Sequence, residues 1–182
     1  MDKNNQFTFK IATEPSEFEQ IYQLNYETFV EEIPQHAKNE EQKLVDKFHD
    51  ENLYFICLKG SEVIGMLCYR DTRPFSLDSK VPNLDELIPK VERMCELRLL
   101  SVKKEYRNGR VFYGIVQELC QFVFKQNYEL ALISGTIRQL KLYKNLGFTV
   151  FADPVGTADA LYYPMYQLVE KFKSEKAQSF KI

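Results

Sequence analysis

The stretch Leu99-Leu-Ser-Val-Lys-Lys-Glu-Tyr-Arg-Asn-Gly-Arg-Val-Phe112 runs from apolar strand chemistry through a polar turn into a helix. Apolar residues recur with helical spacing from Val111 to Val123, so the helix begins directly after the turn. The N-terminus of a helix has unpaired N–H groups and a partial positive charge, which together favour a bound anion. Four cations lie in or beside this turn: Lys103, Lys104, Arg107 and Arg110. Taken alone, the segment still fits a solvated loop better than a binding site, so its context must decide.

Strands and helices alternate on both sides of this turn. Strand patterns cover residues 7–12, 53–59, 62–70, 94–102, 129–134 and 161–169, and Gly60-Ser61 reads as the turn of a hairpin. Helical patterns cover 16–29, opened by a capping box at Ser16 and Glu19, then 111–123 and 137–146. Polar, proline-interrupted segments fill 30–44 and 71–92, the second with a helical turn at 84–88. This order predicts an α/β fold around one central sheet.

Size and composition fit a single domain. The chain has 182 residues, of which 45% are hydrophobic and 27% charged, enough to bury one core without disulfides or metals. We expect residues 1–172 to form this domain. Residues 173–182 are polar and Lys-rich, and we expect them to form a fraying tail.

Composition also argues against several classes of function. The net charge of −2 and the pI of about 5.8 argue against a surface for nucleic acid. The four cysteines stand singly in apolar runs, which indicates buried, reduced thiols. His36 and His49 are too far apart for a helical pair of ligands, so we expect no metal site. The polar start and the lack of an apolar run of about 20 residues predict no signal peptide, no membrane span and a cytoplasmic protein.

A second segment gives the turn its context. The pattern Val102-x-x-Glu-Tyr-Arg107 before an amphipathic helix, followed by Leu142-Tyr-Lys-Asn-Leu-Gly-Phe148, resembles the GNAT acyltransferase superfamily. The resemblance implies a single domain with a central mixed sheet, flanked by helices, that holds an acyl-pantetheine thioester between two splayed parallel strands. These strands would be residues 97–102 and 130–134, with a phosphate loop at 107–111. The implied donor-binding residues are Leu100, Ser101, Val102, Arg107, Asn108, Gly109, Arg110 and Ser134.

The loop departs from the family pattern in a way that bears on the donor. Asn108, Arg110 and Phe112 stand where the family usually has small residues, next to the pyrophosphate of coenzyme A. A phenylalanine at the last of these places should obstruct that pyrophosphate, whereas a donor with one phosphate could still use the turn. The pantetheine of acyl carrier protein is such a donor, and we expect that protein as a partner. A basic surface for it would comprise Lys103, Lys104, Arg107, Arg110 and Lys141.

A narrower resemblance points to the N-acyl amino acid synthases and autoinducer synthases within this superfamily. It rests on four segments: Tyr26-Glu-Thr-Phe-Val-Glu-Glu32, Leu44-Val-Asp-Lys-Phe-His-Asp50, Arg70-Asp-Thr-Arg-Pro-Phe-Ser-Leu77 and Cys95-Glu-Leu-Arg98. The autoinducer synthases normally have a tryptophan in the acidic loop, and this chain has none, which argues against a homoserine-lactone product. The resemblance therefore implies transfer of a fatty acyl group to a small amine such as an amino acid.

Acyl transfer to an amine requires a free amine, a polarised carbonyl and a proton for the leaving thiolate. Glu96 is a candidate base, although an ion pair with Arg98 or Arg93 explains it equally well. Tyr143 is a candidate acid, and a place in the core explains it equally well. Backbone N–H groups near residues 99–101 would polarise the carbonyl, from the β-bulge that the family has there. Candidate residues for the acceptor are Phe29, Asp46, Arg70, Arg73 and Arg98.

Two other functions remain open at this point. One is an ordinary N-acetyltransferase that uses acetyl or acyl coenzyme A with a degenerate phosphate loop. The other is a module without catalytic activity that keeps the fold and binds an acyl ligand. In the preferred function the amine attacks the thioester directly, because no Cys or Ser has a recognisable base beside it in the sequence.

Overall fold

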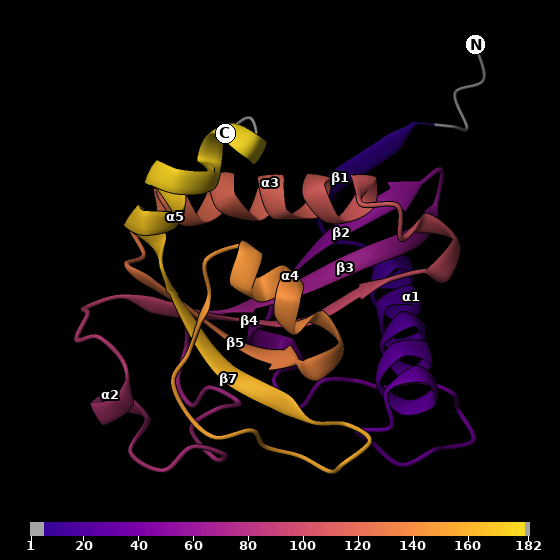
Figure 1. The fold of residues 1–182 in the computed structure, drawn as a ribbon. Coiled ribbons are helices and arrows are strands. Elements are labelled where there is room, and N and C mark those ends of the chain that lie inside the picture. The colour runs from indigo at the N-terminus through magenta and orange to yellow at the C-terminus, as the bar shows by residue number, and fades with distance from the viewer. Residues whose placement is uncertain (1–5, 181–182) are drawn as a thin grey trace. The chain divides into compact units, whose positions relative to one another are not determined.

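The computed structural model describes residues 6–180 (Figure 1). Its strands share one mixed sheet in the order β1-β2-β3-β4-β5-β7-β6, which confirms the predicted α/β class. The strands are β1 (Phe7–Ile11), β2 (Leu53–Lys59), β3 (Glu62–Arg70), β4 (Met94–Val102), β5 (Leu130–Thr136), β6 (Thr149–Val150) and β7 (Tyr162–Leu168). The α-helices are α1 (Pro15–Tyr26), α2 (Leu84–Leu87), α3 (Arg110–Lys125), α4 (Leu140–Asn145) and α5 (Val169–Lys176). Shorter helical segments are η2 (Glu27–Glu32), η3 (His49–Glu51), η4 (Lys104–Tyr106), η5 (Ile137–Gln139) and η6 (Ala177–Phe180).

The chain divides into two compact units, which are described separately. Unit 1 comprises residues up to 69 together with 99–121, and unit 2 comprises 70–98 together with the residues from 122 onwards. Two elements contribute to both units, because β4 passes from unit 2 into unit 1 at Leu99 and α3 passes back at Phe122. The boundary therefore falls within regular elements and not at a linker.

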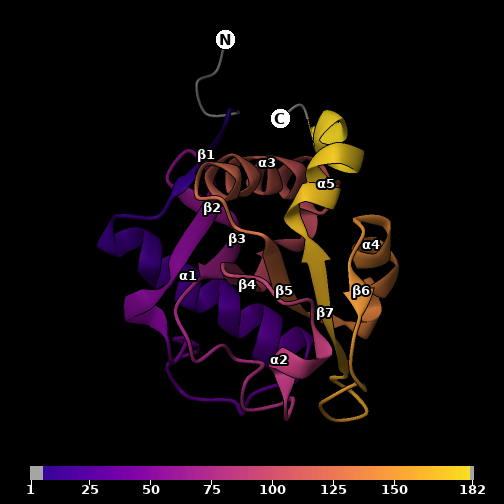
Figure 2. The same cartoon turned by 90° about the vertical axis from the view of Figure 1, so that its left-hand side faces the viewer.

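Unit 1 is built on an antiparallel sheet with a helix on each face. The predicted hairpin is confirmed, since Lys59 pairs with Glu62 across the turn of residues 60 and 61. Side chains alternate between the two faces of a strand, so Tyr54 and Ile56 on β2 share one face with Met66 on β3. This face packs on α1 in one apolar cluster. Helix α3 covers the opposite face (Figure 2).

Two glycines allow α3 to lie directly on the strands. A Cβ atom at Gly65 of β3 would lie 2.6 Å from Val111 Cγ1 at the start of α3. A Cβ atom at Gly114 of α3 would overlap the ring of Phe9 on β1. Because neither space is available, side chains at these two positions would force the helix away from the sheet.

Helix α1 begins and ends differently from the prediction. The capping box is formed by Glu14 and Glu17, not by Ser16 and Glu19: the Glu17 side chain accepts hydrogen bonds from the N–H groups of Thr13 (2.8 Å) and Glu14 (3.1 Å). A proline at the first helical position favours this earlier start. The α-helix also ends at Tyr26, where the chain continues as the π-helix η2. Such wide turns are rare and often lie at functional sites.

Unit 2 is built on the first half of β4, on β5, β7 and β6. Residues 94–97 of β4 pair in parallel with 130–133 of β5, and β7 pairs antiparallel with the whole of β5. The two-residue strand β6 was not predicted. Leu130 and Leu132 of β5 pack in an apolar cluster with residues of the 71–92 segment, among them Phe75 and Leu77.

The C-terminal residues also differ from the expectation of a fraying tail. Helix α5 continues from the end of β7 to Lys176, and η6 extends to Phe180 (Figure 1). The Phe180 ring is buried 5.6 Å from the ring of Phe172, so two aromatic side chains fix this charged helix. Residues 181 and 182 lie outside the described residues. No helix within residues 6–180 combines the length and the apolar character needed to cross a membrane.

Candidate functional site

The middle of β4 has an unusual backbone conformation. Leu99 has a φ of 52°, in the left-handed region that side chains other than glycine seldom adopt. The parallel pairing of β4 with β5 reaches Leu97 and Ile133, two residues before this point. A left-handed residue inside a strand redirects the N–H and C=O groups on either side, as a β-bulge does. The irregularity lies at Leu99, the first of the residues 99–101 whose N–H groups are expected to polarise the carbonyl.

One of the donor-binding residues predicted on the second half of β4, Ser101, contacts the π-helix of the same unit. The Ser101 hydroxyl is buried and forms a short hydrogen bond with the Thr28 hydroxyl of η2. Leu100 and Val102 flank it on the strand, both partly buried. The Val102 carbonyl accepts a hydrogen bond from Arg107 Nε at 2.7 Å. Strand, turn and π-helix are thus joined by side-chain hydrogen bonds.

Arg107 does not extend freely into the turn. Its Nη1 and Nη2 atoms bind the two Glu32 carboxylate oxygens at 2.7 and 2.8 Å, a bidentate pair. This side-chain hydrogen bond raises the pKa of the guanidinium further above its usual range. The pair is partly accessible to solvent, with 39% of the Arg107 side chain and 24% of the Glu32 side chain exposed.

The rest of the turn leads into α3. The Asn108 side-chain oxygen accepts a hydrogen bond from the Arg110 N–H at 3.2 Å, and Gly109 has a φ of 92° that suits glycine. The Arg110 guanidinium lies 4.8 Å from the centre of the Phe7 ring on β1. Lys103, also expected to face a carrier protein, forms an ion pair of 2.5 Å with Glu62 of β3. Three of the five expected surface cations, at positions 103, 107 and 110, therefore have partners within unit 1.

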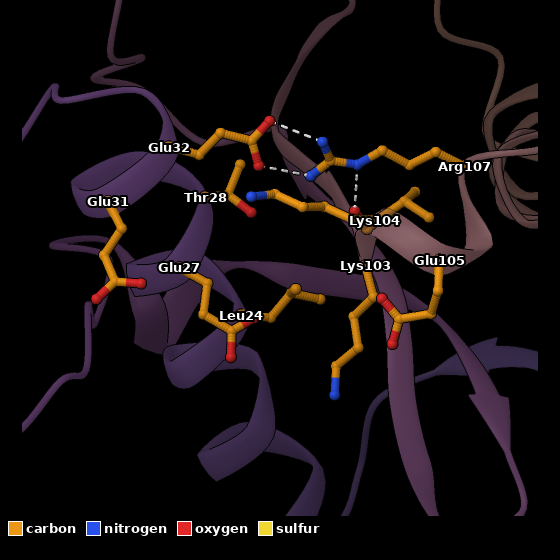
Figure 3. Close-up of a pocket in the computed structure, with 10 residues that line it drawn as sticks. Leu24, Glu27, Thr28, Glu31, Glu32, Lys103, Lys104, Glu105 and Arg107 are labelled. Atoms are coloured by element: carbon orange, nitrogen blue, oxygen red, sulfur yellow. Dashed lines mark hydrogen bonds and ion pairs between the residues drawn. The ribbon is translucent and has the colours of Figure 1, made fainter.

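A pocket of about 450 Å³ lies between η2 and the turn (Figure 3). One wall is a helical face that presents Leu24, Glu27, Thr28, Glu31 and Glu32, and the other wall is Val102, Lys103, Lys104, Glu105 and Arg107. The Lys104 side chain extends across the pocket towards η2. The lining thus contains four carboxylates and three cations, and the pair of Arg107 with Glu32 closes one side of it.

Glu96 lies in unit 2 at the centre of a buried hydrogen-bond network. Its carboxylate is fully buried and accepts hydrogen bonds from the Ser76 N–H (2.8 Å), the Ser76 hydroxyl (2.6 Å) and the Leu77 N–H (3.2 Å). Arg98 Nε lies 3.6 Å from the same carboxylate. The sequence leaves Glu96 open as a base or as the ion-pair partner of Arg98 or Arg93. The structure contains the ion pair with Arg98. The carboxylate also fixes the 71–92 segment to β4.

Tyr143 packs on β5 within the same unit. A Cβ atom at Gly135 would lie 2.9 Å from Tyr143 Cδ2, so the ring is seated over a glycine. Burial raises the pKa of the Tyr143 hydroxyl to about 12, and the group therefore keeps its proton at neutral pH. The neighbouring Ser134 has a buried hydroxyl with no hydrogen-bond partner among the described residues. Side chains of consecutive strand residues point to opposite faces, so the Ser134 hydroxyl lies on the face of β5 away from the Tyr143 ring.

The five predicted acceptor residues differ in availability. Arg70 is buried, and its Nε donates to the Pro74 carbonyl at 3.2 Å. Arg73 is held between Asp78 and Asp85 by two short ion pairs. Arg98 is 12% exposed beside Glu96. In unit 1, Phe29 is buried, and Asp46 accepts hydrogen bonds from Asn52 Nδ2 (2.9 Å) and the Phe48 N–H (3.0 Å). Arg98 combines partial exposure with a neighbouring carboxylate that orients it.

Three residues of these arrangements were not singled out from the sequence. Thr28 and Glu32 belong to the π-helix, and their partners lie more than 70 residues further along the chain. Ser76 contacts Glu96, which lies 20 residues further along the chain. The sequence signals near them are the segment 26–32 for Thr28 and Glu32 and the segment 70–77 for Ser76, and neither reveals which partner each residue meets.

Comparison with known families gives one match. A model described as an acetyltransferase (GNAT) domain matches residues 24–117, more than half of the chain. This range contains the π-helix, β4, the turn and the first half of α3. Among curated proteins, none matches the sequence.

Comparison with solved structures gives neighbours that share the fold. The coenzyme A-dependent acyl-homoserine lactone synthase BjaI superposes with a TM-score of 0.78 at 16% identity, over 97% of this chain and 90% of that one. FeeM, an N-acyl amino acid synthase from uncultured soil microbes, gives 0.78 at 15% identity, over 96% and 97%. An acyl-CoA N-acyltransferase from Pseudomonas aeruginosa gives 0.62 at 12% identity, over 89% and 99%.

Proposed function

Because the chain belongs to the GNAT acetyltransferase domain family and is an acyltransferase of that fold, we propose that it transfers a fatty acyl group to a small amine. The donor in this proposal is the pantetheine thioester of acyl carrier protein, met in the cytoplasm, and the acceptor is an amine such as an amino acid. The amine attacks the thioester carbonyl directly, so that the C–N bond forms, the C–S bond breaks and the thiol leaves with a proton.

The left-handed backbone at Leu99 is the observation that carries this proposal. A leucine at a φ of 52° destabilises the folded state by about 1 kcal/mol, and residues in such strained conformations cluster at functional sites. The redirected N–H groups near Leu99 would polarise the thioester carbonyl as the bond to the amine forms. The pantetheine arm would then follow β4 towards the turn at residues 107–111.

The composition of the turn supports a donor with one phosphate. Arg110 and Phe112 stand at positions where a pyrophosphate needs small residues, and the Arg110 side chain turns back to Phe7. Backbone N–H groups at the start of α3, together with Arg107, suit a single phosphate. BjaI is described as dependent on coenzyme A, so the alternative donor is acyl coenzyme A.

The remaining roles fall to side chains of unit 2. Tyr143 would donate the proton to the leaving thiolate, because its raised pKa keeps the hydroxyl protonated. Arg98, oriented by Glu96, would bind the carboxylate of an amino-acid acceptor. Glu96 acts in this proposal as a positioning residue that holds Arg98 and the segment containing Ser76.

Side-by-side transfer assays test the donor. The purified chain is offered the same fatty acyl group on acyl carrier protein and on coenzyme A, with a panel of amino acids, and products are identified by mass spectrometry. We expect efficient transfer from the carrier protein, with a KM that rises steeply with salt because that partner is acidic. Efficient use of coenzyme A alone, or a KM for the carrier protein that salt leaves unchanged, would contradict the proposed donor.

A further inference from the structure

Glu32 already binds Arg107, the cation on which phosphate binding at the turn depends. Both guanidinium Nη atoms are used by one carboxylate, at 2.7 and 2.8 Å, and Nε is used by the Val102 carbonyl. A phosphate group would bind the same two Nη atoms in the same bidentate way, because guanidinium geometry suits both anions. Carboxylate and phosphate therefore compete for one set of donors.

The competing carboxylate comes from the π-helix. Glu32 is the last residue of η2, and Thr28, one π-helical turn earlier, is fixed to Ser101 of β4. Glu32 thus reaches the turn from a segment whose position is already set by a buried hydrogen bond. Because the hydrogen bond of Thr28 with Ser101 fixes the π-helix, the fold of unit 1 itself places Glu32 against Arg107.

We propose that Glu32 is an intramolecular competitor that donor phosphate displaces from Arg107, an inference that rests on the proposed function of the turn. In the pantetheine thioester of acyl carrier protein the phosphate is a diester, with one negative charge and two free oxygens, so it can take the place of the Glu32 carboxylate on the two Nη atoms of Arg107. It can also accept hydrogen bonds from the N–H groups at the start of α3, which favours it over a ligand that offers only a carboxylate. Free 4′-phosphopantetheine is a monoester with nearly two negative charges, so it should show the exchange more strongly.

Displacement has a second consequence for the pocket. Once released, the Glu32 carboxylate joins Glu27, Glu31 and Glu105 in a lining where Lys104 extends towards η2. The same lining holds Lys103 and Lys104, so the released carboxylate stays near positive charge and close to Arg107. Glu32 can therefore return to Arg107 when the phosphate leaves.

Titration calorimetry with 4′-phosphopantetheine tests the exchange directly, without any acyl transfer. The variants are Glu32→Gln, Arg107→Gln and, as a matched control on the same helix, Glu31→Gln, because Glu31 lines the pocket but is not part of the pair. An exposed ion pair contributes modestly, so release of Arg107 should tighten binding by about two- to fivefold in Glu32→Gln. Arg107→Gln should weaken binding, and Glu31→Gln should stay within the error of the unmodified protein. Glu32→Asp, which is too short for the bidentate pair, should behave like Glu32→Gln.

The outcomes separate this inference from the function on which it rests. If Glu32→Gln and Glu32→Asp bind no more tightly than the unmodified protein while Arg107→Gln binds more weakly, Arg107 binds phosphate but Glu32 only positions it, and the inference is overturned. If Arg107→Gln binds as tightly as the unmodified protein, or if no variant binds at all, the assignment of the turn to donor phosphate is itself wrong. Equal tightening in Glu31→Gln would reduce the effect to general pocket charge and would also overturn the inference. Thermal unfolding of each variant checks that the fold is intact.

Discussion

Replacement of Glu96 by glutamine tests whether this carboxylate is an anchor or a base. An amide has one acceptor oxygen, so either of its orientations places an NH₂ group against a donor of Ser76 or Leu77. At least one buried N–H then loses its partner, which costs about 1–3 kcal/mol, and Arg98 loses the opposite charge. We expect a total loss of about 3 kcal/mol in the free energy of unfolding. For a chain of this size, that is a fall in Tm of roughly 6–12 °C.

The assay combines thermal unfolding with steady-state kinetics on the same preparations. Glu129→Gln is the matched control, because Glu129 also accepts hydrogen bonds from two backbone N–H groups (2.7 and 3.1 Å) but is exposed to water. Water can replace those bonds, so the control should lose less than about 1 kcal/mol. A Glu96→Gln protein with an unchanged Tm and no turnover would refute the anchor argument and favour a base.

Three further predictions concern other parts of the chain. Tyr143→Phe removes the proton donor and should lower kcat by about 10²-fold with an unchanged Tm, which steady-state kinetics and thermal unfolding together measure; an unchanged kcat would exclude Tyr143 as the acid. Gly135→Ala places a methyl group 2.9 Å from both Tyr143 Cδ2 and Met165 Sδ, so unfolding in urea should show a loss of about 1–3 kcal/mol and kcat should fall as well. Burial alone would raise the pKa of Glu17, but hydrogen bonds from Lys10, Thr13 and Glu14 outweigh it and lower the pKa. The folded-state pKa is therefore below the unfolded value of 4.5, so the contribution of Glu17 is present above that value and is lost as the pH falls through the folded pKa. The difference in unfolding free energy between the unmodified protein and Glu17→Gln should accordingly shrink between pH 7 and pH 3, and a constant difference would contradict it.

Elements with a strong local pattern were predictable from the sequence. The hairpin of β2 and β3 follows from two apolar runs that flank Gly60-Ser61, and β4 was placed at its observed bounds. The strand β6 has only two residues, too few to show a period. Helix α5 was missed because its sequence is mainly charged, and its placement depends on the buried rings of Phe172 and Phe180.

The candidate site was predictable only where its partners are close in sequence. Glu96 and Arg98 lie on one side of a strand by its period of two, so their pairing could be weighed in advance. The contact of Glu96 with Ser76 depends on how an irregular segment returns to the sheet, which no local pattern encodes. The π-helix is a similar case, because its hydrogen bonds to Ser101 and Arg107 join residues that only the folded unit brings together.

The close seat of α3 on its sheet decides which side of the turn can respond to a ligand. Phe9 fills the notch left by Gly114, and Val111 fills the one left by Gly65, so the first two turns of the helix are locked against sliding or lifting. The N–H groups at the start of α3 thus keep a fixed position. Any adjustment to a bound anion must come from the other side of the turn, where the Arg107 side chain binds Glu32 of the π-helix. Engineering of donor preference should accordingly target η2 and leave α3 unchanged.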